Sequence, residues 1–434
     1  MRFLARDVAA ATGGTLVGPD VEIDGVSFDS RSLRPGQLFV PLIDRRDGHD
    51  FIGVALERGA AAYLTSRPAG MGSAIEVPDT LQALMLLAAD RRRLLDSAVI
   101  GITGSVGKTT TKDLARAALA ASRRTWANER SFNNDLGLPA TILNAPDDTE
   151  VLVLEMGMRG FGEVKRLCDI ARPQVGVITR VAEAHGDRVG GILGVAAAKA
   201  ELVDALPANG TAILNGDDSL VRAMATRCAG AVLLFGEGAD CEVRVADLSL
   251  DHLARASFTV HTPWGSAHVA LAVSGRHMML NAAAALACVG VVGGDIQAGA
   301  AAMGEVRLTA MRMQVGRAIG GALVLNDSYN ANPTSMRAAL DALVALPAHR
   351  RFAVLGVMAE ITDHEAEHRA IHAYAAERGV EVVAFGTALY GVTPIDDPVA
   401  ALVALGAIGD GDAVLVKGSR VAGLERVADS LLTR

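Results

Sequence analysis

The stretch Ala98-Val-Ile-Gly-Ile102, Thr103-Gly-Ser-Val-Gly-Lys-Thr109 and Thr110 to Leu119 decides the fold of this chain. Its first part is a short apolar run that predicts a buried strand, its second is a glycine-rich turn, and its third has helical spacing. Together they predict a phosphate cradle, because backbone amides and the helix N-terminus face the bound anion. Lys108 can reach the β- and γ-phosphates, and the hydroxyl of Thr109 can bind Mg²⁺. We therefore expect a nucleotide-binding domain.

This loop is a shortened form of the standard phosphate loop. The standard pattern places a glycine five residues before Gly107, and that position is Ile102. An ordinary glycine turn followed by an unrelated Lys-Thr pair is the alternative, but the flanking strand and helix favour a phosphate loop. The residues expected to contact the nucleotide are Thr103, Gly104, Ser105, Val106, Gly107, Lys108, Thr109 and Thr110.

Length and composition indicate a large α/β protein. The chain has 434 residues, which predicts about three domains. Half of the residues are hydrophobic but only 4% are aromatic, as in tightly packed helices around parallel strands. The net charge of -8 argues against nucleic acid as a partner, which needs clustered Lys and Arg. Arg91-Arg-Arg93 is the only run of three basic residues, and we expect it to cap a surface helix.

The cysteines and the apolar runs predict a cytoplasmic protein without a membrane span. The four cysteines are far apart and have no metal-binding spacing, so we expect reduced, mostly buried thiols. The N-terminal pattern is that of a helix, and no signal peptide is evident. The longest apolar stretch, Leu280 to Gly294, is too short to cross a bilayer.

The pattern of strands and helices predicts an α/β fold in three domains. Residues 1–97 form a small α/β module, residues 98–316 a central P-loop-type ATPase domain with a mostly parallel sheet, and residues 317–434 a Rossmann-like domain. The alternating segment from 241 to 273 is expected to form an appended sheet. Two α/β layers beside a shared cleft suit an enzyme with two substrates.

Three side chains of the central domain are candidates for chemistry. Glu155 ends an apolar strand beside the phosphate loop, where such enzymes hold magnesium, although it could pair with a surface cation. His185 follows the strand Gln174–Thr179 and is expected at the same sheet edge, although a lone histidine is usually structural. Lys199 lies among small apolar residues, where an amine can lose its proton, although it could extend to solvent.

Further polar clusters follow other predicted strands. Asp29-Ser-Arg31 and Arg46-Asp-Gly-His-Asp-Phe51 are ligand candidates, but their residues are also common in turns. Asn133 and Asn134 could simply cap a helix. Asp327-Ser-Tyr-Asn-Ala-Asn-Pro333 is a polar loop between a strand and a helix.

Taken in order, these motifs resemble the Mur ligase family over essentially the whole chain. The matching motifs are the short phosphate loop, Glu155-Met-Gly157, His185, Lys199-Ala-Glu201, Gly275-Arg-His277 with Asn281, and Asp327-Ser-Tyr-Asn-Ala-Asn-Pro333. Within the family, the last motif, Met358-Ala-Glu-Ile361 and Lys417-Gly-Ser-Arg420 are similar to the member that adds D-alanyl-D-alanine to UDP-N-acetylmuramoyl-tripeptide. The resemblance implies an ATP-dependent amide ligase of peptidoglycan synthesis that forms an acyl phosphate and releases ADP and phosphate.

The resemblance also implies roles for single residues. It implies two Mg²⁺ ions, the first held by Thr109 and Glu155 and the second by His185 and a carbamylated Lys199. Lys108 would offset the repulsion between the substrate carboxylate and the γ-phosphate. The remaining assignments are Asn281, Arg312 and Asp327 at ATP, Ser30, Arg31, Asp47 and His49 at the UDP-sugar, Asn133 and Asn134 near the acyl end, and Asn330 and Asn332 at the dipeptide.

Several alternatives stay open. The sister ligase that adds the third amino acid, or a folylpolyglutamate synthetase, would share the central domain and differ in the loop after Asp327. A nucleotide-regulated binding or scaffold protein would have lost Glu155, His185 or Lys199, and the chain has all three. Met278 and Val357 replace an asparagine and an aspartate that are frequent in the family. The first change removes one polar contact to the nucleotide, and neither alters a residue of the phosphate loop or a proposed metal ligand. We expect an active monomer, with either diaminopimelate or lysine as the third residue of its peptide substrate.

Overall fold

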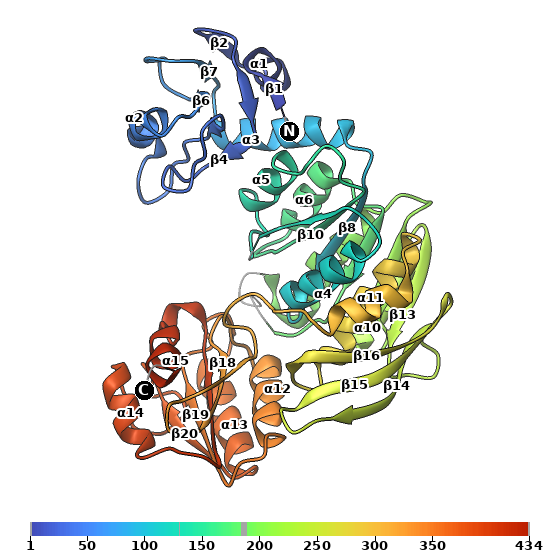
Figure 1. Ribbon diagram of the computed structural model, residues 1–434, viewed down its shortest axis with the longest axis vertical. Helices are drawn as coiled ribbons and strands as arrows, with labels where there is room; N and C mark the ends of the chain where they lie inside the picture. The colour runs from blue at the N-terminus through green and yellow to red at the C-terminus, as the bar shows by residue number, and fades with distance from the viewer. Residues whose placement is uncertain (1, 130, 184–188, 433–434) are drawn as a thin grey trace. The chain divides into compact units, whose positions relative to one another are not determined.

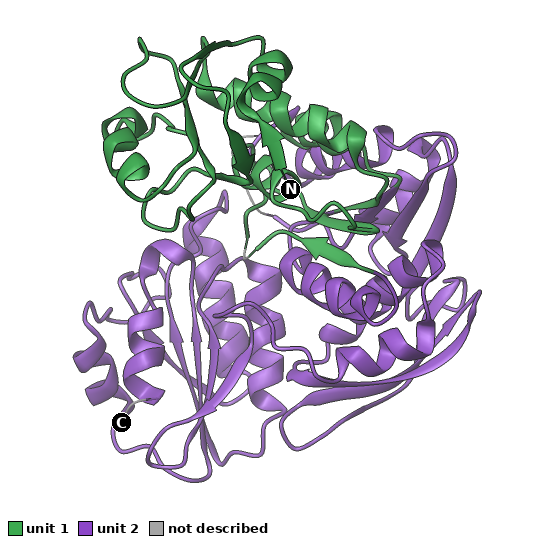
Figure 2. Ribbon diagram, turned by 45° about the horizontal axis from the view of Figure 1, so that its top comes forward, with its two compact units in different colours: residues 1–101, 124–158, 163–174 green, residues 102–123, 159–162, 175–434 purple. Residues whose placement is uncertain are grey.

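The computed structural model describes residues 2–129, 131–183 and 189–432, which form two compact units. Unit 1 comprises residues 1–101, 124–158 and 163–174, and unit 2 comprises residues 102–123, 159–162 and 175–434 (Figure 2). β8, Ala98–Thr103, belongs to both, so the chain enters unit 2 just before the phosphate loop. The division into three domains after residues 97 and 316 stays a prediction.

Unit 1 contains a five-stranded sheet in the order β2-β7-β6-β5-β4. β2 is antiparallel to β7, and the other neighbours are parallel. β1 and β3 form a separate antiparallel pair. β3 and β4 are consecutive in the chain but belong to different sheets, because Gly25 turns the chain with a φ of 82° between them. The bounds are β1 Arg2–Leu4, β2 Thr15–Val17, β3 Glu22–Asp24, β4 Val26–Ser27, β5 Leu38–Phe39, β6 Ala62–Thr65 and β7 Ala74–Glu76.

Unit 1 also contains two strands and two helices from residues 124–174, together with the helices of its N-terminal part. β10, Val151–Glu155, pairs parallel with β9, Thr125–Ala127. The side chain of Asn144 joins this part to β4: its Oδ1 accepts from the Val26 N–H at 3.0 Å and its Nδ2 donates to the Val26 carbonyl. The helices are α1 Ala5–Thr12, η1 Gly48–Phe51, α2 Ile52–Glu57, α3 Thr80–Leu94, α5 Gly137–Leu143 and α6 Glu163–Ala171.

Two of the three arginines at the end of α3 are buried and only Arg93 is exposed, so the expectation that the whole run caps a surface helix is wrong. Arg91 and Arg92 are each only 6% exposed. The Arg92 guanidinium donates to the carbonyls of Leu95, Ser97 and Ala171. Burial is tolerated because these carbonyls replace water as hydrogen-bond acceptors.

In unit 2, six strands follow one another in the order β16-β15-β14-β13-β12-β11. Neighbours from β11 to β14 are parallel, and β14, β15 and β16 are antiparallel. The segment 241–273 thus continues the central sheet instead of forming an appended one, because β14 pairs directly with the end of β13. The strands are β11 Val175–Ile178, β12 Thr211–Asn215, β13 Ala231–Gly236, β14 Val243–Leu250, β15 Arg255–Thr262 and β16 Gly265–Ser274.

Helices of the same part of unit 2 pack on this sheet. α4, which carries the phosphate loop at its start, packs against α10 and α11, and α11 also lies on β16 (Figure 1). α10 is almost entirely buried, which explains its uniformly apolar sequence. The helices are α4 Lys108–Ala120, α8 Gly191–Asp204, α9 Ser219–Ala223, η2 Met224–Arg227, α10 Met278–Val291 and α11 Ile296–Met303.

The C-terminal part of unit 2 is a five-stranded sheet in the order β17-β18-β21-β19-β20. β17 is an antiparallel edge strand and the other neighbours are parallel, with Asp327 opposite Lys417 at the ends of β18 and β21. α12 and α13 contact each other and the sheet, as do α14 and α15 (Figure 1). The bounds are β17 Gln314–Arg317, β18 Leu323–Asp327, α12 Pro333–Val344, β19 Arg350–Leu355, α13 His364–Ala376, β20 Val380–Ala384, α14 Pro398–Leu405, β21 Asp412–Lys417, η3 Arg420–Ala422 and α15 Glu425–Leu432.

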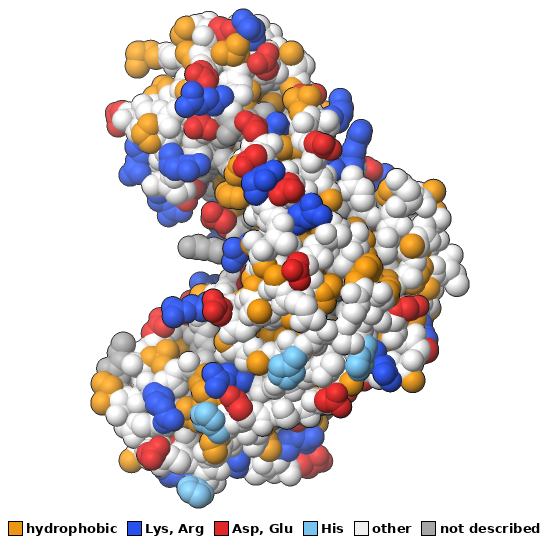
Figure 3. Space-filling view, turned by 45° about the vertical axis from the view of Figure 1, so that its right-hand side comes forward, with side chains coloured by type: hydrophobic (Ala, Val, Ile, Leu, Met, Phe, Trp, Pro, Cys, Tyr) orange, Lys and Arg blue, Asp and Glu red, His pale blue; other side chains and the backbone are white. Residues whose placement is uncertain are grey.

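The surface charge and the helix lengths bear on the expected partners. On the face shown in Figure 3, basic and acidic side chains are interspersed and do not form a basic stripe. Within the described residues, none of the helices combines the length and the apolar character that crossing a membrane requires.

Candidate active site

The phosphate loop of unit 2 has the backbone that its glycines predict. Gly104 has a φ of 151°, and a Cβ there would lie 2.0 Å from the Thr179 hydroxyl. Gly107, the N-cap of α4, has a φ of 89°, and a Cβ there would lie 2.5 Å from Asn281 Oδ1. Only glycine fits both positions, because each combines an unusual backbone with a close neighbour. The loop is held further by Ser105, whose N–H and hydroxyl donate to carbonyls that follow β11.

A polar pocket lies over this loop and is lined by residues of unit 2 alone. Lys108 folds back so that its Nζ donates to the Gly104 carbonyl at 2.6 Å. The structure thus brings together most residues predicted at ATP, together with Asn330 and Asn332. The lining residues are Ser105, Val106, Gly107, Lys108, Thr109, Thr110, His277, Met278, Asn281, Arg312, Met313, Asp327, Asn330, Asn332, Ser335, Ala338 and Lys417.

Arg312 reaches this pocket from the segment before β17. Its Nη2 lies 3.4 Å from the Thr109 hydroxyl, and its guanidinium stacks 4.2 Å from the ring centre of Tyr329. Its Nε is buried and makes no hydrogen bond to the described residues. A half-buried guanidinium with an unused donor, next to a phosphate loop, is suited to an anionic oxygen.

Asp327 and Lys417 form a buried ion pair at the floor of the pocket. Lys417 Nζ also donates to the Asn330 carbonyl at 2.9 Å, and Asp327 Oδ1 accepts from the Met313 N–H. Burial lowers the pKa of Lys417, and Asp327 opposes that effect. Burial also lowers the pKa of His277 to about 4, so this pocket residue is neutral near pH 7. The sequence places Lys417 in a polar turn at the end of a strand, but it does not indicate that Asp327 is the partner of this lysine.

Lys199 lies on α8 and is 3% exposed. Its pKa is well below the usual range, mainly because burial disfavours the charged amine and also because Lys108 is nearby, while Glu360 acts in the opposite direction. The alternative of a lysine that extends to solvent is therefore wrong. His185, the other residue predicted at the second metal, lies outside the described residues.

Glu155 ends β10 in unit 1 and is 1% exposed. Its N–H donates to Asn128 Oδ1, and its Oε1 accepts from Asn133 Nδ2 at 2.7 Å. Its Oε2 is buried and has no hydrogen-bond partner in the part of the chain that the structure describes. The reading of Glu155 as a surface ion pair is therefore wrong, and the unused oxygen fits a cation ligand.

The side chain of Asn134, which follows Asn133, forms hydrogen bonds with the nearby backbone. Its Oδ1 accepts from the N–H groups of Leu136 and Gly137 at the start of α5. This is the helix-capping use that the sequence left open, and it leaves the amide nitrogen for other contacts. Within the described residues, no group of three or more His, Cys, Asp or Glu side chains is arranged around a possible metal ion.

A second pocket, of about 520 Å³, is formed by unit 1 alone. Its walls combine aromatic rings with carboxylate, guanidinium and amide groups, and Trp126 is fixed by its Nε1–H bond to the Thr141 carbonyl. Ser30 and Arg31 do not line this pocket. Arg31 instead forms two hydrogen bonds with the carboxylate of Asp29, and Asp29 does line the pocket. The lining residues are Val26, Ser27, Phe28, Asp29, Ser32, Arg34, Gln37, Trp126, Ala127, Glu129, Phe132, Ala140, Thr141 and Asn144.

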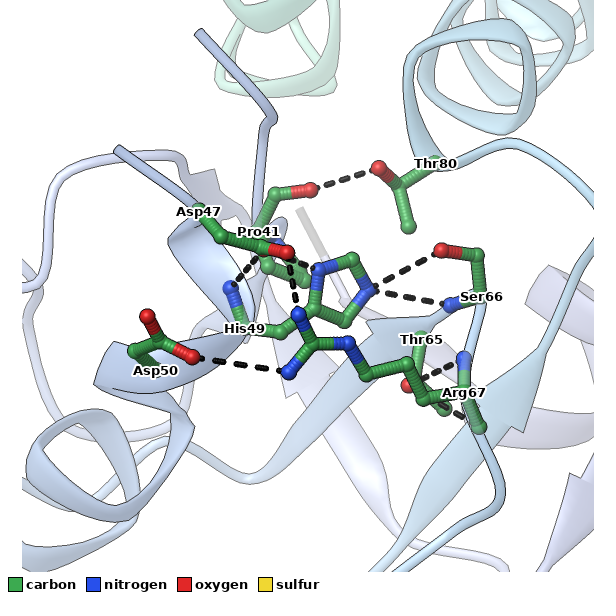
Figure 4. A network of polar contacts seen from close by, with 8 residues as sticks. All are labelled: Pro41, Asp47, His49, Asp50, Thr65, Ser66, Arg67 and Thr80. Atoms are coloured by element: carbon green, nitrogen blue, oxygen red, sulfur yellow. Dashed lines mark hydrogen bonds and ion pairs between the residues drawn. The ribbon is translucent and has the colours of Figure 1, made fainter. Parts of the chain in front are cut away.

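Asp47 and His49 lie in a polar network elsewhere in unit 1 (Figure 4). His49 Nδ1 lies 2.6 Å from Asp47 Oδ1, and its Nε2 accepts from the Ser66 N–H at 3.1 Å. Arg67 pairs with Asp47 and Asp50. Hydrogen bonds from His49 lower the pKa of Asp47. The His49 side chain is 1% exposed with both nitrogens engaged, so it braces the turn.

The chain is similar to known proteins over most of its length. The Mur ligase middle domain matches residues 102–289, and the Mur ligase glutamate ligase domain matches residues 311–420. A curated protein of Mycobacterium bovis, "UDP-N-acetylmuramoyl-tripeptide--D-alanyl-D-alanine ligase", is 38% identical over 94% of this chain and 92% of its own length.

Solved structures of MurF proteins also resemble this chain. A crystal structure of MurF from Acinetobacter baumannii superposes with a TM-score of 0.90 at 29% identity, covering 100% of this chain and 99% of its own. MurF ligase from Thermotoga maritima, in complex with ADP, superposes with a TM-score of 0.80 at 27% identity, covering 94% of this chain and 96% of its own.

Proposed function

The chain belongs to the Mur ligase family, and we propose that it is the ATP-dependent ligase that joins D-alanyl-D-alanine to UDP-N-acetylmuramoyl-tripeptide. The observation that carries this proposal is the pocket of unit 2, where Lys108, Arg312 and Asp327 converge on a phosphate loop. The relative with this printed activity matches nearly the whole chain, and a MurF structure in the same fold holds ADP. ATP and a UDP-sugar are cytoplasmic metabolites, so we place the reaction in the cytoplasm.

The chemistry requires two anions to meet. The tripeptide carboxylate attacks the γ-phosphate of ATP, ADP leaves, and the amine of D-alanyl-D-alanine then displaces phosphate from the acyl phosphate. Lys108 and Arg312 supply positive charge where the γ-phosphate would lie, which lowers the repulsion and stabilises the transferring group. Asp327 lines the pocket beside its Lys417 partner, and its carboxylate oxygens are suited to accept from the ribose hydroxyls.

Two magnesium ions and a carbamylated lysine complete this proposal. Thr109 and Glu155 are the proposed ligands of one ion, and the unused Oε2 of Glu155 supports a cation there. Lys199 and His185 are the proposed ligands of the other. Carbamylation needs a neutral amine, which the burial of Lys199 favours, and it makes an anionic oxygen ligand. The ions, when bound, would neutralise phosphate charge.

The UDP-sugar is proposed to bind in a different pocket from ATP and the dipeptide. The aromatic and polar pocket of unit 1 suits a uracil base and a sugar, and we extend the predicted UDP-sugar site to its lining. Ser30 and Arg31 border it through Asp29, while Asp47 and His49 lie in the polar network elsewhere in unit 1. Asn330 and Asn332 remain the proposed contacts of the dipeptide, and both line the nucleotide pocket.

An amine-acceptor screen tests the proposed reaction. Purified protein is mixed with ATP, Mg²⁺ and a UDP-N-acetylmuramoyl-tripeptide containing either diaminopimelate or lysine, and phosphate release is followed. We expect release with D-alanyl-D-alanine and not with single amino acids. Turnover of a dipeptide precursor with an added third amino acid, or of a folate with glutamate, would support the sister enzymes instead.

Substitution of Lys199 tests the carbamate. We expect Lys199→Ala to lose at least about 100-fold in ligation rate, because it removes a cation ligand beside the reacting phosphate. Added short carboxylic acids should restore part of the rate by occupying the space of the carbamate. Lys165→Ala, an exposed lysine that pairs with Asp169 on α6, is the matched control and should be normal. Full activity of Lys199→Ala would contradict the assignment.

A further inference from the structure

Arg312 lies in a short segment, residues 309–314, whose backbone is unusual. Met311 and Met313, on either side of Arg312, have φ values of 61° and 48°. Non-glycine side chains rarely adopt this left-handed conformation, because the Cβ is brought too close to the backbone. Two such residues persist only where surrounding contacts fix them, and such strain is concentrated at functional sites.

The contacts that fix the segment come from both ends. At one end, Asp113 on α4 accepts from the N–H of Thr309 at 2.9 Å and from its hydroxyl at 2.8 Å, both on Oδ2. At the other end, the Met313 N–H donates to Asp327, and the Tyr329 N–H donates to the Met311 carbonyl. The segment is thus held to the nucleotide-binding helix and to the strand that carries Asp327.

Asp113 is itself held in place. Its side chain is 8% exposed, and its Oδ1 pairs at 2.8 Å with Nζ of the buried Lys112. It lies on the same helix as Lys108 and Thr109, five residues after the phosphate-loop lysine. A buried carboxylate that receives two hydrogen bonds from one threonine is a precise anchor, because both donors approach a single charged oxygen.

We propose that Asp113 and Thr309 are positioning residues that hold Arg312 over the phosphate loop. Through them, helix α4 sets the distance between Lys108 and the guanidinium, so that both cations meet the same phosphate group. This inference rests on the proposed function, because it concerns the transfer of that phosphate. Neither residue belongs to the motifs that carry the resemblance to the Mur ligase family.

A double-mutant cycle of Thr309 and Arg312 tests the inference. Because Asp113 also pairs with Lys112, its removal would disturb folding, and the test therefore uses Thr309→Val, which removes one donor at nearly constant volume. We expect kcat to fall about three- to tenfold, with ADP affinity changed less than twofold. Thr309→Ser, which keeps the hydroxyl, should recover most of the loss. The matched control is Thr226→Val, an exposed threonine that bonds only to the Ala223 carbonyl among the described residues.

The cycle separates positioning from general destabilisation. Arg312→Ala should reduce kcat by about 100-fold or more, and adding Thr309→Val to it should cause no further loss. Losses that multiply, or a normal kcat for Thr309→Val, would overturn the inference. A wild-type protein without ligation in the amine screen would contradict the proposed function instead. Melting temperatures of all variants, measured in parallel, show whether a loss of activity reflects unfolding.

Discussion

Glu155 shows how a single residue reveals its chemistry. One of its carboxylate oxygens accepts from Asn133, and the other is buried without a hydrogen bond to any described residue. Burial of an unpaired carboxylate oxygen costs stability, and such a cost is kept where the oxygen has a function. A substitution of Glu155 should therefore change ligase activity and stability in opposite directions, and the two can be measured independently.

We expect Glu155→Gln to lose ligase activity by more than about 100-fold while its free energy of unfolding rises by about 1 kcal/mol. The amide oxygen can still accept from Asn133, but the negative charge is removed. Urea unfolding without Mg²⁺ and phosphate release with Mg²⁺ measure the two effects. Glu57→Gln, on the exposed side of α2, is the control and should change neither. A less stable but active Glu155→Gln would contradict a metal-binding role.

The phosphate-loop residues of the nucleotide pocket could be predicted from a local motif, whereas Asn281, Arg312 and Asp327 were assigned to ATP through the resemblance to the Mur ligase family. Lys108, Asn281, Arg312 and Asp327 come from distant parts of the chain and line one pocket. The roles of Lys417, Asp113 and Trp126 could not be predicted, because each depends on a partner that only the fold brings close. Asn134 and His49 show the converse: their residue types are common in binding sites, but their bonds here are largely internal.

At the scale of elements, long apolar runs were predictable and short ones were not. β8, β10 and β11 appear where the sequence places strands, because each is a buried run of four to six residues. β3 and β4 have two or three residues, and the turn at Gly25 assigns them to different sheets. The sheet to which β14–β16 belong depends on pairing across the chain, which alternation alone does not specify.

The β8–loop–α4 element predicts a sharp effect of Gly104→Ala. A Cβ would lie 2.0 Å from the Thr179 hydroxyl, at a φ that favours glycine. We expect a loss of about 2 kcal/mol or more in unfolding free energy and loss of ADP binding, because the loop must shift. Calorimetric titration with ADP and urea unfolding measure both. Gly162→Ala, where no heavy atom lies within 4 Å of the added Cβ, is the control for a glycine with positive φ.

The contact between α13 and the end of β19 predicts a pH dependence. His368 Nε2 accepts from the Met358 N–H at 2.9 Å, and burial lowers the pKa of this histidine. The unfolded chain therefore binds the proton more readily, and stability should fall as the pH drops below about 6.5, the ordinary histidine value. Urea midpoints at pH 7.5 and 5.5 should differ less in His368→Gln, which keeps an acceptor but cannot be protonated. An equal difference in both proteins would show that other groups cause it.

At the scale of the whole molecule, each pocket is lined by residues of one unit. The phosphate-loop pocket belongs to unit 2 and the aromatic pocket to unit 1. A ligand that binds only the folded state stabilises the part that forms its site, by about 2.7 kcal/mol at a hundredfold excess over Kd. Hydrogen exchange can assign this stabilisation to segments, because amides report the opening of the unit in which they lie.

We therefore expect ADP to slow exchange in α4, β18 and β21, and UDP-N-acetylmuramoyl-tripeptide to slow it in β4, β9 and α5. Exchange measured by mass spectrometry with each ligand alone distinguishes the two patterns. In Gly104→Ala the ADP effect should disappear while the effect of the UDP-sugar peptide persists, since that substitution alters only the loop of unit 2. If ADP protected β2, β6 and β7 of unit 1 as strongly as β18, the two units would unfold as one cooperative body, and ligand binding in either would stabilise the entire chain.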